Sequence, residues 1–174
     1  MLLVVTGGAR SGKSTFAVEY GVRHSGPVVF VATAPVIDDD MRVRIDRHRA
    51  ERPAWPTVEE TCDIAPIVSS ASAGSLVIVD CLTLWVSNLM WRGETDSEIE
   101  RAAEALAKSV PNDATVLVVT NEVGLGVHPE TDLGRRYRDV LGRVNQRLVA
   151  AADRALFMVA GRALPLSDPW DLVS

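Results

Sequence analysis

Residues near the start of the chain have the types and spacing that bind phosphate. Residues 7–14, with the sequence GGARSGKS, match G-x-x-x-x-G-K-[ST] at every fixed position. Glycine lets such a loop turn tightly and bring its N–H groups up to phosphate oxygens. The ammonium of Lys13 can reach the β- and γ-phosphates, and the hydroxyl of Ser14 can bind Mg²⁺. We therefore expect nucleoside triphosphate binding by Gly7, Gly8, Ala9, Arg10, Ser11, Gly12, Lys13, Ser14 and Thr15.

The residues on either side of this motif support that interpretation. An apolar run at residues 2–5 predicts a strand before the loop, and Phe16, Ala17, Tyr20 and Val22 follow it at helical spacing. A strand, a loop and a helix in this order form the context that the phosphate-binding motif needs. The alternative is a glycine-rich turn without a ligand, and this context argues against it.

Asp80 is the second candidate for the nucleotide site. It follows the continuous apolar run of residues 75–79, and ligands of a parallel sheet lie at the carboxyl ends of its strands. The carboxylate could hold Mg²⁺ directly or through water, or it could bind a ribose hydroxyl. The structural alternative is an aspartate that only caps the next turn. Asn121 and Glu122, after another apolar run, could position substrate or metal, or merely order their own loop.

A predicted helix at residues 41–51 carries an unusual set of cations. Arg44, His48 and Arg52 fall on one face at helical spacing, and Arg47 and Arg49 flank the histidine. Arginines here could neutralise a triphosphate, and a neutral imidazole beside it could attack phosphorus. A solvated or structural histidine is the alternative, and the spacing does not decide between the two.

Composition excludes several classes of protein. The 174 residues include 18 basic and 23 acidic side chains, and this net charge of −5 argues against general nucleic-acid binding. No apolar stretch has the length of a membrane span, and the first apolar run lacks the basic n-region of a signal peptide, so we expect neither a membrane span nor a signal peptide. Cys62 and Cys81 lack metal-binding spacing, so we expect reduced thiols and a cytoplasmic protein.

Apolar runs and helical patterns alternate along the chain. Strands are predicted at Val28–Ala32 and at residues 75–79, 115–120 and 155–159. Further helices are predicted at residues 64–71, from a capping box of Ser97 and Glu100, and after a cap at Thr131 or Asp132. Pro165 and Pro169 argue against regular structure in the tail. This alternation predicts a single α/β domain over residues 1–174, with a P-loop NTPase-like, mostly parallel central sheet flanked by helices.

The motifs in order resemble a known family, the bifunctional adenosylcobinamide kinase/adenosylcobinamide-phosphate guanylyltransferases of cobalamin biosynthesis. The resemblance covers residues 1–161, nearly the whole chain. Its phosphate loop alone would be unspecific, whereas the ordered combination is specific. The motifs are Gly7-Gly-Ala-Arg-Ser-Gly-Lys-Ser14, Ala32-Thr-Ala34, Arg44-x-x-x-His48, Arg52-Pro53, Trp55, Val79-Asp-Cys-Leu-Thr83, Ser87-Asn-Leu89, Thr120-Asn-Glu-Val-Gly124, Gly134-Arg-x-Tyr-Arg-Asp139 and Leu141-Gly-Arg-Val-Asn-Gln146.

The resemblance implies two reactions. ATP or GTP phosphorylates adenosylcobinamide, and GMP then passes from GTP through a covalent histidine intermediate to adenosylcobinamide phosphate, which gives adenosylcobinamide-GDP. By motif position that histidine is His48, and Lys13 is the second catalytic residue. Thr33, Arg52, Glu59 and Asp80 join the nucleotide site, and Ser14 and Asp80 are the ligands of a transient Mg²⁺.

The resemblance also implies a homotrimer with sites near the subunit boundaries. The sequence supports a trimer only weakly, through three large apolar side chains that lie close together: Trp85, Leu89 and Trp91. Such side chains belong either to an interface or to the core. Two other functions remain as alternatives: a different small-molecule P-loop kinase or nucleotidyltransferase, and a P-loop ATPase that drives a protein partner.

Overall fold

The computed structural model describes residues 1–35 and 39–173, and within helix α2 it describes only the side chains of residues 39, 42, 43, 45, 49 and 50. The described chain forms one seven-stranded sheet in the order β3-β2-β4-β5-β1-β6-β7. All neighbouring strands are parallel except β6 and β7, which are antiparallel. The strands are β1 (Leu2–Gly7), β2 (Val28–Ala32), β3 (Thr57–Glu59), β4 (Leu76–Asp80), β5 (Thr115–Val119), β6 (Arg154–Val159) and β7 (Arg162–Pro165).

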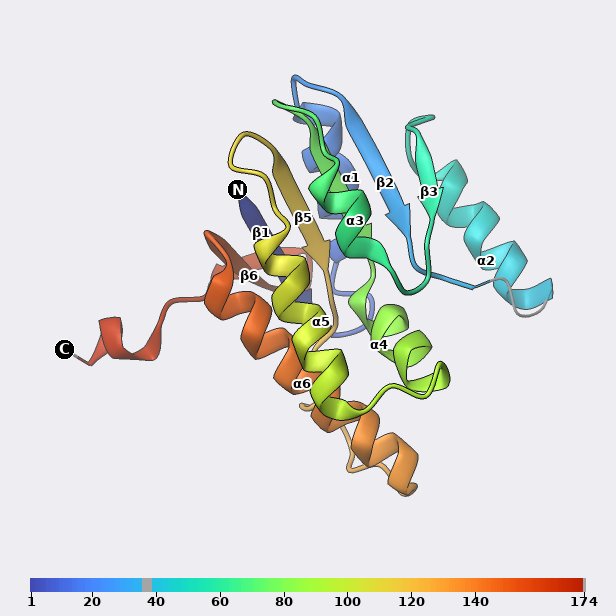
Figure 1. Cartoon of the computed structure of the whole chain (residues 1–174), viewed down its shortest axis with the longest axis vertical. Helices are drawn as coiled ribbons and strands as arrows, with labels where there is room; N and C mark the ends of the chain where they lie inside the picture. The colour runs from blue at the N-terminus through green and yellow to red at the C-terminus, as the bar shows by residue number, and fades with distance from the viewer. Residues whose placement is uncertain (36–38, 174) are drawn as a thin grey trace.

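Helices cover both faces of this sheet, as Figure 1 shows. Helices α3 to α6 lie over one face, and α1 packs on the other. Because both faces are covered, the central strands are apolar on both sides: Val4 joins the first apolar cluster, and Val5 joins the second. The helices are α1 (Lys13–Arg23), α2 (Asp39–Ala50), α3 (Ile64–Ser69), α4 (Leu82–Trp91), α5 (Asp96–Lys108) and α6 (Asp132–Ala151), followed by a short 3-10 helix (Pro169–Leu172).

The tail of the chain is more regular than the sequence predicts. Strand β7 (Arg162–Pro165) pairs with β6, and the 3-10 helix begins at Pro169, so the expectation of an irregular tail is wrong. Pro165 is tolerated because β7 is an edge strand of the sheet. Proline lacks a backbone N–H, and an edge strand has no neighbour on its open side that would need one. The three residues of β3 were also not predicted, since they stand directly after Pro56.

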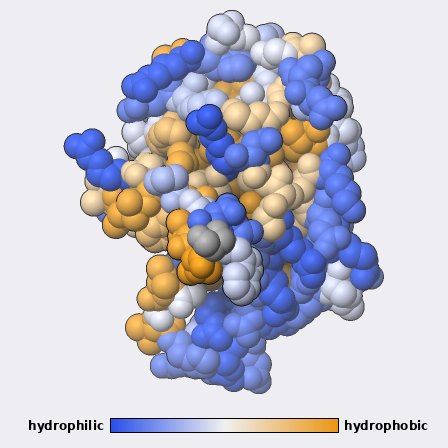
Figure 2. All heavy atoms as spheres, turned by 90° about the vertical axis from the view of Figure 1, so that its left-hand side faces the viewer, coloured by the Kyte–Doolittle hydropathy of each residue, from blue (hydrophilic) through white to orange (hydrophobic). Residues whose placement is uncertain are grey.

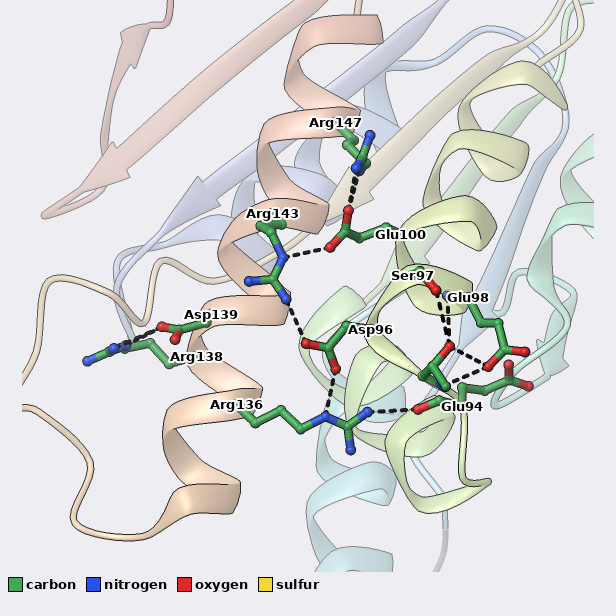
Figure 3. Close-up of polar contacts among 11 residues, drawn as sticks. Glu94, Asp96, Ser97, Glu98, Glu100, Arg136, Arg138, Asp139, Arg143 and Arg147 are labelled. Carbon is green, nitrogen blue, oxygen red and sulfur yellow. Dashed lines mark hydrogen bonds and ion pairs between the residues drawn. The ribbon is translucent and has the colours of Figure 1, made fainter.

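The start of helix α5 differs from the prediction by two residues. Thr95, not Ser97, is the N-cap, and the capping box joins it to Glu98 rather than to Glu100. The Thr95 N–H donates to the Glu98 carboxylate over 2.7 Å. Glu100 instead faces α6, where its carboxylate accepts a hydrogen bond of 2.6 Å from Nε of Arg143 (Figure 3). The contact between the two helices therefore decides which of two similar patterns forms the cap.

A ladder of ion pairs joins α5 to α6 (Figure 3). Asp96 accepts from Arg136 over 2.7 Å and from Arg143 over 2.8 Å. Glu100 bridges Arg143 and Arg147, and its side chain is only 14% exposed. Hydrogen bonds from Arg147 and Arg143 lower the pKa of Glu100. Several shared charges at a partly buried contact stabilise more than isolated surface pairs do.

Replacing Glu100 with glutamine is expected to lower the free energy of unfolding by about 1 kcal/mol at neutral pH, the upper range for exposed pairs. Because the folded-state pKa of Glu100 is lowered, its contribution is complete above the unfolded pKa and is lost as the pH falls through the folded value. Urea unfolding at pH 7 and pH 3 should therefore show a smaller difference between the two proteins at pH 3. Arg23→Gln, which breaks an exposed pair with Glu19, is the control. An equal effect of both variants at pH 7 would contradict the role of the ladder.

Candidate active site

The phosphate loop lies between β1 and α1 and depends on glycine at two positions. Gly7 has φ +149°, and a Cβ there would stand 2.3 Å from the carbonyl oxygen of Met158. Gly12, the residue before α1, has φ +100°. At Gly8 a Cβ would meet no protein atom within 4 Å. The fold itself therefore requires glycine at Gly7 and Gly12. At Gly8, by contrast, only the close approach of a ligand would require glycine.

The ammonium of Lys13 is folded against this loop. Its Nζ donates to the carbonyl oxygens of Gly7 at 3.0 Å and Gly8 at 2.6 Å, and to Oγ of Ser11 at 3.3 Å. The residue is only 6% exposed. Burial lowers the pKa of Lys13, and the charge of Asp80 acts in the opposite direction. A buried cation on a long side chain beside the loop N–H groups can turn toward bound phosphate.

A pocket of about 360 Å³ adjoins the loop. Four of its residues come from α1. Ser14 lies one helical turn before Val18, and Thr15 lies one turn before Glu19, so the four share one side of that helix. The others come from β2, from the end of β4 and from the residues just after α2. The lining residues are Ser14, Thr15, Val18, Glu19, Phe30, Glu51, Arg52 and Asp80.

Ser14 and Asp80 both line this pocket, and their oxygens are donors of the kind that Mg²⁺ prefers. Asp80 ends β4, which lies between β2 and β5, so it stands at the carboxyl edge of the sheet. Its carboxylate raises the pKa values of both Lys13 and Arg52 against the lowering effect of burial. A hydroxyl and a carboxylate near the phosphate loop fit a metal ion that phosphate oxygens and water also ligate.

Arg52 forms one wall of the pocket. Its guanidinium lies 3.7 Å from the centre of the Phe30 ring, and its NH2 donates to Oγ1 of Thr57 over 3.1 Å. Glu59 pairs with Arg49 nearby. Arg52 therefore lines the pocket. The ion pair that the structure describes for Glu59 is with Arg49.

Thr33 is fully buried and bonds to the turn that follows Asp80. Its Oγ1 donates to the Cys81 carbonyl over 2.7 Å and accepts from the Cys81 N–H over 2.9 Å. The peptide bond between Asp80 and Cys81 is cis. Thr33 therefore supports the backbone beside Asp80, and its hydroxyl is directed at protein atoms.

Comparison with known proteins gives the family. A profile described as "Cobinamide kinase / cobinamide phosphate guanyltransferase", named CobU, matches residues 3–166. The chain belongs to the CobU family. It is 40% identical to the bifunctional adenosylcobalamin biosynthesis protein CobU of Salmonella typhimurium, over 92% of this chain and 97% of that one. It is 41% identical to CobP of Pseudomonas aeruginosa, over 94% and 95% of the two chains.

Solved structures support the P-loop fold of this CobU-family enzyme. FlaH from Methanocaldococcus jannaschii matches with a TM-score of 0.55 at 12% identity, over 95% of this chain and 77% of that one. The RadB recombinase matches with a TM-score of 0.51 at 16% identity, over 90% and 73%. At such low identity the likeness concerns the fold alone. The predicted α/β class with a mostly parallel sheet is confirmed.

The predicted nucleophile of this CobU-family member lies on α2 (Asp39–Ala50). The side chains of His48, Arg44 and Arg47 fall outside the described part of the structure. Among the described arginines, Arg49 of this cluster pairs with Glu59, and Arg42 at the start of α2 pairs with Asp39. Arg52 instead contacts Phe30 and Thr57. The pocket residue Arg52 follows His48 by four positions, which links the end of α2 to the pocket.

Asn121 and Glu122 make contacts that order their own loop. The Asn121 carbonyl accepts from Nδ2 of Asn145 over 3.0 Å, and the Glu122 carboxylate accepts from the Gly124 N–H over 2.9 Å. The Glu122 N–H donates to the Gly7 carbonyl over 3.1 Å, which ties this loop to the phosphate loop. These contacts support the interpretation that Asn121 and Glu122 order their own loop.

Four further residues complete the pocket lining and are not among the predicted site residues: Val18, Glu19, Phe30 and Glu51. The helical repeat would have identified two of them, because Val18 and Glu19 lie four and five residues after Ser14 on the same side of α1. Phe30 lies inside an apolar strand and carries no sequence signal of its own. Its role becomes visible only when Arg52 is found against its ring.

Replacing Asp80 with asparagine keeps the shape of the side chain but removes its charge. We expect turnover to fall about 10- to 100-fold and its dependence on Mg²⁺ to change, as when a carboxylate near a metal is lost. Since Asp80 raises the pKa of Lys13, the loss of activity at alkaline pH should move to lower pH. Rates measured against Mg²⁺ concentration and pH test this. An effect confined to nucleotide affinity, and absent with a deoxyribose nucleotide, would favour the ribose hypothesis; kinetics identical to wild type would exclude both.

Proposed function

We propose that this enzyme phosphorylates adenosylcobinamide with ATP or GTP and then transfers GMP from GTP to adenosylcobinamide phosphate through a covalent adduct on His48. Membership of the CobU family, whose members are described as bifunctional, supports the two activities. The observation that carries the proposal is the pocket that joins the phosphate loop, through Ser14 and Asp80, to the residues immediately after α2. One site can therefore serve both steps.

In the first reaction the loop N–H groups and Lys13 hold the triphosphate. The substrate hydroxyl attacks the γ-phosphorus, the bond to the β-phosphate oxygen breaks, and the hydroxyl proton passes to solvent or to a general base. Such a transfer mainly needs alignment and neutralisation of charge. Mg²⁺ held by Ser14 and Asp80 would supply additional positive charge beside the phosphates when it is bound.

In the second reaction a nitrogen of neutral His48 attacks the α-phosphorus of GTP. The N–P bond forms as the bond to pyrophosphate breaks, and the phosphate of adenosylcobinamide phosphate later displaces the histidine. The covalent intermediate divides one displacement into two, so the two acceptors need not be present together. Arg52, which follows α2 and lines the pocket, would neutralise the phosphate that passes to His48.

Incubation of the enzyme with adenosylcobinamide and GTP tests the proposal. Mass spectrometry should detect adenosylcobinamide phosphate first and adenosylcobinamide-GDP later, with release of pyrophosphate. GTP hydrolysis without either product would contradict it and would favour a P-loop ATPase that acts on a protein partner. Phosphate transfer to an unrelated small alcohol only would favour a different kinase.

We also propose that the enzyme is a homotrimer, as the family resemblance implies. Exposed apolar side chains support association: Trp91 is 84% exposed, and Trp170, Leu172 and Val173 of the tail are about as exposed. Figure 2 looks onto the face from which the tail projects, where apolar side chains gather. Trp85 and Leu89, by contrast, are core residues at 1% exposure, so they lend no support.

Light scattering at micromolar concentration is expected to give three times the 18.8 kDa mass of the chain. Replacing Trp170 with serine removes an exposed apolar side chain at little cost to the monomer, so any fall in mass reports on association. A wild-type mass near 18.8 kDa would contradict the trimer.

A further inference from the structure

A second cavity, of about 400 Å³, lies on the face of the sheet that α1 covers. It is bounded by the first residues of β1 and β6, so it lies toward the edge of the sheet opposite to the phosphate loop. Arg154 contributes the one charged side chain of its lining, which is otherwise apolar or aromatic. The lining residues are Met1, Leu3, Phe16, Tyr20, Arg154 and Leu156, and none of them belongs to the nucleotide pocket.

The sheet beside this cavity is open to solvent. Helix α1 packs against β1, β4 and β5, and strands β6 and β7 extend the sheet beyond it. Pro165 of β7 pairs with Leu156 of the cavity, so the two side chains lie on the same face. All four residues of β7 are exposed. Figure 2 shows apolar side chains on this side of the molecule, from which the tail projects.

The tail after β7 carries apolar side chains that do not pack in the core of their own chain. The Leu166 N–H donates to the Ala155 carbonyl over 2.9 Å, and the chain beyond it projects away from the sheet (Figure 1). The 3-10 helix of this tail presents Trp170, which is 75% exposed. Its N–H donates to the Asp168 carboxylate over 2.9 Å, which fixes the turn. The family profile matches residues 3–166, so the turn lies beyond the matched residues.

The cavity and the tail are complementary in shape and charge. A cavity of this volume is in the range that holds a small ring system, and Phe16 and Tyr20 offer aromatic partners for an indole. Arg154 is exposed and makes no ion pair with the residues that the structure describes. Asp171 follows Trp170 directly and is also exposed. An indole in the cavity would therefore bring a carboxylate to the arginine at its rim.

We propose that the tail of one subunit inserts Trp170 into this cavity of a second copy of the chain, where Asp171 pairs with Arg154 of the receiving subunit. The inference rests on the proposed homotrimer. Each chain has one tail and one cavity on different surfaces, so the contact is head-to-tail. Contacts of this kind repeat from copy to copy and can close into a ring. Three of them, one at each subunit boundary, complete a closed trimer.

Reversal of the two charges tests the contact. Arg154→Glu and Asp171→Arg each bring like charges together, so the protein concentration at half dissociation, measured by light scattering, should rise about 3- to 10-fold. The double variant should return to within about two-fold of wild type. Trp170→Ser should raise this concentration more, about 10- to 100-fold, as for an aromatic anchor of an interface. Arg101→Glu, the same change of charge on α5 over the other face of the sheet, is the control and should stay within about two-fold.

Mixing the two single variants distinguishes a contact between subunits from one within a chain. In the mixture a tail of either variant finds the opposite charge in a cavity of the other variant. The mixture should therefore dissociate at a lower concentration than either variant alone, which a tail held in its own cavity cannot cause. Circular dichroism confirms that each variant is folded.

Three results would overturn the tail contact: a double variant as weak as the single variants, a mixture that shows no recovery, or unchanged dissociation of Trp170→Ser. If the wild-type protein has the mass of three chains in these experiments, the homotrimer stands and only the tail contact is wrong. A wild-type mass near 18.8 kDa would contradict both the homotrimer and the tail contact.

Discussion

Lys13→Ala is expected to reduce kinase turnover roughly 100- to 1,000-fold, the range seen when one preorganised donor to a developing charge is removed. The Lys13 ammonium is the buried cation of the phosphate loop, and it donates to the carbonyls of Gly7 and Gly8. When phosphate binds, this charge can neutralise the transferred group, which loop N–H groups alone would do less well. Transfer of label from γ-³²P nucleotide to adenosylcobinamide measures the effect.

Lys108→Ala is the matched control for this experiment. Lys108 is the only other lysine of the chain and lies exposed in the last turn of α5, far in sequence from the loop. Its loss should leave turnover within about two-fold, as for surface substitutions away from structural features. Unchanged turnover in a folded Lys13→Ala protein would refute the assignment of the phosphate site.

His48→Asn is expected to separate the two activities. Asparagine approximates the size of imidazole but cannot attack phosphorus, so covalent transfer of GMP should fall to background. The kinase step uses the phosphate loop, so phosphorylated adenosylcobinamide should still accumulate. Uptake of label from [α-³²P]GTP and product analysis by mass spectrometry measure the two steps in the same sample.

The other two histidines provide the controls. Nε2 of His24 lies 3.0 Å from the Gly74 carbonyl oxygen, and Nδ1 of His128 lies 2.7 Å from Arg138. His24→Asn and His128→Asn should both retain the label. If His48→Asn still takes up label and His128→Asn does not, the nucleophile is His128, in the loop that follows β5.

Much of the fold follows from local sequence, because the central strands are continuous apolar runs. Val28–Ala32 is a strand as predicted, and the long helix α6 is capped by Thr131, one of the two residues predicted for this role. The structure differs from the prediction where a contact with a residue distant in sequence determines the local conformation. Both Thr95 and Ser97 stand three residues before a glutamate, and only the pairing of Glu100 with arginines of α6 shows which one caps α5. No pattern within residues 95–100 contains that information.

The candidate site also has a part that local sequence predicts and a part that it does not. The phosphate loop is a local motif, so its residues and their element could be predicted together. The pocket beside it is built from α1, β2, β4 and the end of α2, and its wall depends on the contact between Arg52 and Phe30. Thr33 illustrates the limit of motif position, since its hydroxyl bonds to the backbone of Cys81. A motif can place a residue near a site without showing what its side chain touches.

The most direct measurement is the identification of the residue that carries GMP. The wild-type protein, treated with GTP and digested, should yield one peptide with a GMP adduct, and fragmentation should place it on His48. The bond should be lost in acid and kept in alkali, as expected of a phosphoramidate, and adenosylcobinamide phosphate added before digestion should remove it. An adduct on another residue, or none under conditions in which adenosylcobinamide-GDP still forms, would contradict guanylyl transfer through His48.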